Sequence, residues 1–253
     1  MKKIKKKGSR KKPQVLPAFV IGYTLAEPPP PGYLAAWFNQ RYGGPLQIQF
    51  PNEAGHSRFD AIHTTWHVTV NTALPEDTAE TWHQGLEWSH SQLAAVAPVQ
   101  HVGQDKRDIA LHTARIARGI TLLTEGTAYD VVTHSFLNPS DWSDRPLDQF
   151  DIEDHVKVEQ QENLATCQIW FYTLGLAKFG LEEIETFRPL GLPDQPVIDK
   201  LLEIGTLLLG TGKGTKVGDQ LPLPESGHVV RIERHRTDQS TGRVLHLREV
   251  IWE

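Results

Sequence analysis

Cysteine is nearly absent from this sequence, and so are the long apolar runs that would place it in a membrane. Cys167 is the single cysteine among 253 residues, so the chain can form neither an internal disulfide nor a cysteine-based zinc cluster. No apolar run approaches the roughly 20 residues of a membrane-spanning helix, and the basic start of the chain lacks the apolar segment of a signal peptide. These absences predict a soluble protein of the reducing cytoplasm, without membrane contact.

Positive charge is concentrated at the start of the chain. Residues 1–12 hold eight basic side chains and no acidic one, which leaves 18 basic against 31 acidic residues in the remainder. An acidic body repels a phosphate backbone, so binding of nucleic acid is expected only through the tail. Residues 1–14 are predicted to form a disordered basic tail, either simply solvated or used as an arm for RNA, the ribosome or anionic lipid.

Hydrophobic periodicity in residues 15–103 predicts an α+β half. Apolar runs and alternation indicate strands, and apolar spacing of three to four residues indicates helices. In chain order we expect a strand over 15–23, a helix over 33–43, strands over 46–50 and 62–70, a helix that begins near Asp77, and a strand over 94–102. This is the order of a ferredoxin-like βαββαβ unit.

Residues 104–253 are predicted to form a second α+β half, a mixed α/β layer packed so closely against the first that the two behave as one compact unit. Its expected elements are a helix over about 105–124, a central strand that contains Ile169–Tyr172, a helix over about 195–209 and a terminal β-hairpin of 229–233 and 244–251. Gly210 and Gly212 are expected to end the second helix.

Twelve histidines make a metal site the first chemistry to test. His83, Glu87 and His90 lie at i, i+4 and i+7 of a predicted helix, so they share about one face and could hold zinc. The alternative is that both histidines are boundary residues beside the apolar stripe of that helix. His63 and His67 are less suitable, because four residues of strand separate them by roughly 13 Å. No other cofactor is predicted.

Three further patterns predict no site. Gly210–Thr215 departs from a phosphate-binding loop, because it follows a helix and Gly214 occupies the Ser/Thr position. Cys167 adjoins an apolar strand, which is typical of an inert packing thiol, and no nucleophile elbow is present. The carboxylates of residues 141–154 could line a cation or substrate site, but their spacing matches no EF-hand loop and favours a solvated acidic loop.

Several segments resemble a bacterial family known as a domain of unknown function (DUF4261-like). The similar segments are Phe19–Pro29, Trp88–Val102, Phe136–Trp142 and, most distinctively, Thr173–Glu183. The resemblance spans roughly residues 16–225 and implies a stable domain architecture. It implies no activity, ligand or catalytic residue.

The patterns favour a non-catalytic binding or interaction module, since no arrangement of nucleophile, base and orienting group is visible and no catalytic residue is assigned. The acidic body favours a protein partner or self-association over nucleic acid. The alternative is an enzyme, a metal-assisted hydrolase that uses His83, Glu87 and His90.

Overall fold

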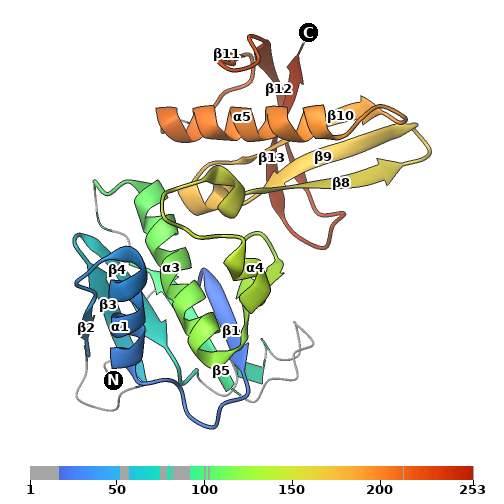
Figure 1. Ribbon diagram of the computed structural model, residues 1–253. Helices are drawn as coiled ribbons and strands as arrows, with labels where there is room; N and C mark the ends of the chain where they lie inside the picture. Colours follow the sequence, from blue (N-terminus) through green and yellow to red (C-terminus); the bar gives the residue numbers. More distant parts are fainter. Residues whose placement is uncertain are drawn as a thin grey trace, which may run out of the picture.

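The computed structural model describes residues 17–51, 57–74, 79–80, 82, 92–99, 101, 103–212 and 214–252. Figure 1 shows two sheets with helices packed against them, which confirms the α+β class. The first part of the chain contains β1 (Phe19–Tyr23), α1 (Pro31–Tyr42), β2 (Gln47–Gln49), β3 (Arg58–His63), β4 (Trp66–Asn71), β5 (Gln92–Pro98), α3 (Lys106–Thr124), β6 (Thr127–Asp130), β7 (Ser135–Leu137) and α4 (Pro139–Ser143). The second part contains η1 (Ile152–Asp154), β8 (Lys157–Asn163), β9 (Gln168–Leu174), η2 (Leu176–Phe179), β10 (Glu183–Pro189), α5 (Gln195–Thr211), β11 (Gln220–Pro222), β12 (Val229–Asp238) and β13 (Leu245–Trp252).

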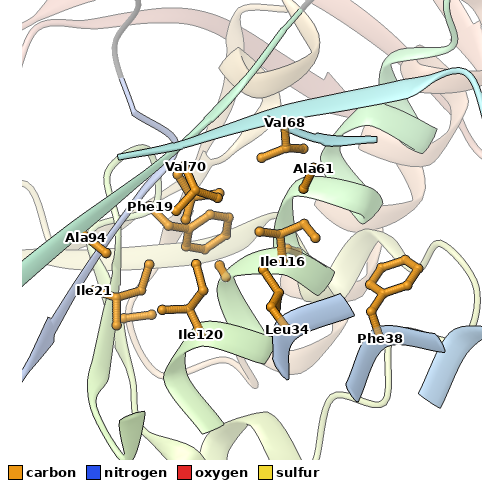
Figure 2. Packing of buried hydrophobic residues seen from close by; sticks show 14 of the residues in the cluster. Phe19, Ile21, Leu34, Phe38, Ala61, Val68, Val70, Ala94, Ile116 and Ile120 are labelled. Atoms are coloured by element: carbon orange, nitrogen blue, oxygen red, sulfur yellow. The ribbon is translucent and has the colours of Figure 1, made fainter. Parts of the chain in front are cut away.

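The first sheet has seven strands in the order β2-β3-β4-β5-β1-β6-β7. Helices α1 and α3 cover one of its faces (Figure 1). Figure 2 shows the resulting core, in which Ile116 and Ile120 of α3 and Leu34 of α1 meet Ile21 and Val70 of the sheet. Burial of this apolar surface is the main force that holds the layers together.

The expected ferredoxin-like order is wrong for this sheet. In a ferredoxin-like βαββαβ sheet the first strand lies between the third and the fourth, and neighbouring strands are antiparallel. The pairs of the first sheet are antiparallel too, so the difference is in the strand order. β5 lies between β4 and β1, and a further strand, β6, covers the other side of β1.

The expected strand over 62–70 is also wrong, because this segment is part of a hairpin. β3 and β4 pair with His63 opposite Trp66, and the two residues between them, Thr64 and Thr65, make the turn. Thr64 has a positive φ of 55°. The turn contains no Gly, Asn or Pro, so the usual sequence signal for a hairpin is missing.

The second sheet has six strands in the order β11-β12-β13-β10-β9-β8. Helix α5 covers one face (Figure 1), where Leu201 and Ile204 pack against Phe171 and Ile184. The predicted terminal hairpin is confirmed as β12 and β13, and the predicted helices over 105–124 and 195–209 are confirmed as α3 and α5.

The expected division between residues 103 and 104 does not separate the two sheets. Helix α3, β6, β7 and α4 all contribute to the first core or the first sheet. Phe150 packs against both cores, so the chain passes from one α+β unit to the other near this residue. The reason is that α3 has an apolar face that fits the first sheet, which periodicity cannot reveal.

In the described part of the chain, every helix is too short or too polar to pass through a bilayer. The predicted basic tail over 1–14 lies outside the described residues.

Candidate ligand cavity

A cavity of about 460 Å³ lies where the two α+β units meet. The first unit contributes the turn after β6 to the cavity wall. The second unit contributes η2, the residues that follow η2, and the start of β13. Its lining residues are Val131, Val132, His134, Leu174, Ala177, Gly180, Leu181, Glu182, Glu183, Arg243, Val244, Leu245 and His246. Mostly apolar walls with a few polar groups are typical of small-molecule sites.

The η2 side of the cavity is held by one buried carboxylate. Glu183 accepts hydrogen bonds from the Thr173 hydroxyl at 2.7 Å and from the backbone amides of Gly175, Leu176 and Ala177 at 2.9, 3.2 and 3.1 Å. Burial raises the pKa of Glu183, and these four donors oppose that rise. The carboxylate thus satisfies the free amides at the start of η2 and fixes this wall.

Gly175 makes this arrangement possible. Its φ is +130°, and a Cβ at this position would lie 2.2 Å from the carbonyl oxygen of His155. No side chain fits there. Gly180 ends η2 in the left-handed conformation with φ +69°, which glycine adopts without strain.

A buried ion pair joins the two units beside the cavity. The ammonium of Lys178 in η2 lies 2.5 Å from the carboxylate of Asp130 in β6, and the two side chains are only 8% and 3% exposed. Lys178 also donates to the carbonyl of His155 at 2.9 Å. Asp130 accepts from the amides of Val132 and Thr133 at 3.0 and 3.1 Å. This network fixes the turn that forms the opposite wall.

His134 is the polar group of that opposite wall. Its Nδ1 is hydrogen-bonded to the Tyr129 hydroxyl. Burial and the positive charges of Arg243 and Lys157 lower the pKa of His134. The imidazole is therefore neutral at neutral pH and contributes a dipole to the cavity.

The carboxylate of Glu182 is already compensated by its own neighbours. It pairs with Arg248 and with His235, whose Nε2 lies at 3.2 Å. Arg243 differs, because its guanidinium has no ion pair or hydrogen bond with any described residue.

The predicted metal ligands His83, Glu87 and His90 lie outside the described residues, so the zinc hypothesis stays a prediction. Across the described ranges, no group of three or more His, Cys, Asp or Glu side chains is placed to hold a metal ion. His63 and His67 lie on opposite faces of the β3–β4 hairpin. His63 faces α3, and His67 lies 3.2 Å from Asp60.

The remaining candidate residues from the sequence either have structural roles or lie in surroundings that differ from those expected. Cys167 is exposed in the β8–β9 turn, so its prediction as a packing thiol is wrong. In the acidic segment, Asp141 completes the capping box of α4 and Asp151 caps η1, which accounts for two of its carboxylates. Gly212 ends α5 in the left-handed conformation, as expected for a helix stop, whereas Gly210 lies inside the helix and does not end it.

A buried histidine was not singled out by the sequence. His112 of α3 is fully buried, and its ring lies 6.0 Å from that of His63, 5.6 Å from Phe38 and 5.5 Å from Trp66. Burial lowers the pKa of His112 to about 3, against a weaker opposing backbone contact with Ala61. The one sequence signal was its position between the apolar residues Leu111 and Ile116 of a core-facing helix.

Comparison with protein-family models, with curated proteins and with solved structures finds no match for this chain.

Proposed function

We propose that this chain is a non-catalytic binding protein whose ligand cavity lies between its two α+β units. The observation that supports this most is the cavity of about 460 Å³, which is large enough for a small organic molecule. Its walls are held in place by the Glu183 hydrogen bonds and the Asp130–Lys178 ion pair. A mostly apolar cavity whose walls are held by such contacts favours retention of a ligand, because little ordering of the walls is needed on binding.

A reducing, cytoplasmic setting is part of this proposal. Cys167 is exposed and is the single cysteine of the chain. An exposed free thiol persists in a reducing compartment and is oxidised or paired elsewhere.

The neutral dye N-phenyl-1-naphthylamine tests the cavity, because its fluorescence rises when it leaves water for an apolar site. The wild-type chain is expected to enhance the fluorescence saturably with one site per chain. Ala177→Phe places a large ring on the exposed part of the cavity wall, so it should abolish the enhancement while the circular dichroism spectrum stays unchanged.

Ala165→Phe is the matched control. Ala165 is also exposed, but it lies in the turn between β8 and β9, away from the cavity. This variant adds the same apolar ring and should bind the dye as the wild type does. Equal dye binding by both variants, or no saturable dye binding by the wild type, would contradict the proposal that the cavity binds a ligand. If mass spectrometry detects that the protein chemically converts small molecules that it binds, the proposal that it is non-catalytic is contradicted.

A further inference from the structure

Most charged groups around the cavity have partners of their own. Glu182 is paired with Arg248 and His235, and Glu183 is held by four hydrogen-bond donors. Of the nearby lysines, Lys178 is paired with Asp130 and Lys157 with Glu159 at 2.6 Å. A third, Lys106, lies beside Gly180 and donates to the carbonyl oxygen of Phe179 at 2.6 Å. The guanidinium of Arg243 is left with no ion pair in the described part of the chain.

The charge of Arg243 acts on the groups around the cavity. Its positive charge adds to burial in lowering the pKa of His134, and it opposes the larger rise that burial causes in the pKa values of Tyr129 and Tyr172. Arg243 is half-buried and lines the cavity together with residues of both α+β units. A guanidinium is always protonated and presents a planar pair of donors that matches a carboxylate.

The rest of the wall is apolar. Val131 and Val132 from the first unit face Leu174, Leu181 and Leu245 from the second, and Val244 adjoins Arg243 directly. A ligand that satisfies the whole cavity therefore needs an apolar body and one anionic end.

Resting on the cavity function proposed above, we propose that the ligand is a small carboxylic acid with an apolar body. Its carboxylate accepts a bidentate pair of hydrogen bonds from Arg243, and its hydrocarbon part lies against Val131, Val132 and Leu174. Arg243 is thus a binding residue that selects the charge of the ligand, and the apolar walls select its body.

Three probes with the same hydrocarbon chain separate charge from apolar contact: octanoate, octanol and octylamine. Each is titrated against the chain by isothermal titration calorimetry, and each is also used to displace N-phenyl-1-naphthylamine. We expect octanoate to bind at least about tenfold more tightly than octanol, as charge-assisted hydrogen bonds of this kind allow. Octylamine should bind most weakly, because Arg243 repels its ammonium.

Arg243→Gln is the decisive variant. It should weaken octanoate to the level of octanol and leave octanol unchanged. Arg231→Gln is the matched control, because Arg231 lies on β12, pairs with Glu233 at 2.9 Å and carries the same charge without lining the cavity. This control should keep the wild-type preference for octanoate, which excludes a general effect of net charge.

The outcomes separate this inference from the cavity function itself. If octanol and octanoate bind equally, or if Arg243→Gln keeps the preference, the carboxylate inference is overturned while the cavity stands. If calorimetry detects binding of neither octanoate nor octanol but the dye still binds, the carboxylic-acid inference is again contradicted, whereas the proposal of a ligand-binding cavity is not. If neither dye nor probe binds, both proposals fail together.

Discussion

The two buried histidines should make this protein lose stability in mild acid. Burial lowers the pKa values of His112 and His155 to about 3, whereas an unfolded histidine titrates near 6.5. Below about pH 6.5 the unfolded chain binds protons that the folded chain does not, so the free energy of unfolding falls as the pH falls towards about 3. Above about pH 6.5 both forms are neutral, and the two histidines contribute no pH dependence.

The size of the effect follows from the shift. Each such histidine contributes a slope of about 1.36 kcal/mol per pH unit between the two pKa values, hence roughly 2 kcal/mol between about pH 7.5 and about pH 5. His112→Phe removes the titrating group and keeps a ring beside Phe38 and Trp66. Between these two pH values the variant should lose about 2 kcal/mol less stability than the wild type.

Urea unfolding at each pH, followed by tryptophan fluorescence and by circular dichroism, measures this difference. Coincidence of the two signals checks that the two cores unfold together. The slope with pH is the readout, so a constant offset from altered packing in His112→Phe does not matter. His228→Phe, at an exposed position, should keep the wild-type slope. An unchanged acid slope in His112→Phe would show that His112 is not neutral in the folded protein.

Two further substitutions test the junction of the units. Lys178→Met leaves Asp130 buried without its cation and should lower the free energy of unfolding, measured with urea, by about 3–5 kcal/mol. Adding Asp130→Asn to this variant should recover part of the lost stability. A loss below about 1 kcal/mol in Lys178→Met would contradict a stabilising ion pair. Gly175→Ala places a Cβ 2.2 Å from the carbonyl oxygen of His155 and should lower the melting temperature markedly. Gly210→Ala, in α5 with nothing within 4 Å, should raise stability by up to about 1 kcal/mol, and equal effects of the two substitutions would refute the steric argument.

Local patterns predicted β9, α5, β12 and β13 of the second unit correctly, but not β8, β10 or β11. The helix that became α5 and the hairpin of β12 and β13 follow from apolar spacing, from Gly212 and from the 238–242 turn. These features depend on neighbours in sequence, so a single chain segment contains the information. The β3–β4 hairpin was missed because Thr64 and Thr65 carry no turn signal.

Strand order could not be predicted in the same way. Periodicity shows which face of an element is apolar, but not which partner covers it. The insertion of β5 between β4 and β1, and the packing of α3 on the first sheet, are decided by contacts between residues far apart in sequence. The strand order expected from the succession of elements along the chain was therefore wrong for the first sheet.

The cavity was likewise invisible in the sequence. Lys178 offered one signal, a charge inside the apolar stretch from Leu174 to Phe179, and Thr173–Glu183 stood out as a segment. Arg243 offered none, because it follows Gly242 in a polar turn like many exposed arginines. By itself, the sequence determined that this is an acidic α+β chain with one cysteine and a basic start. Only the tertiary structure placed Arg243 beside His134, because a site between two units exists only after both have folded and met.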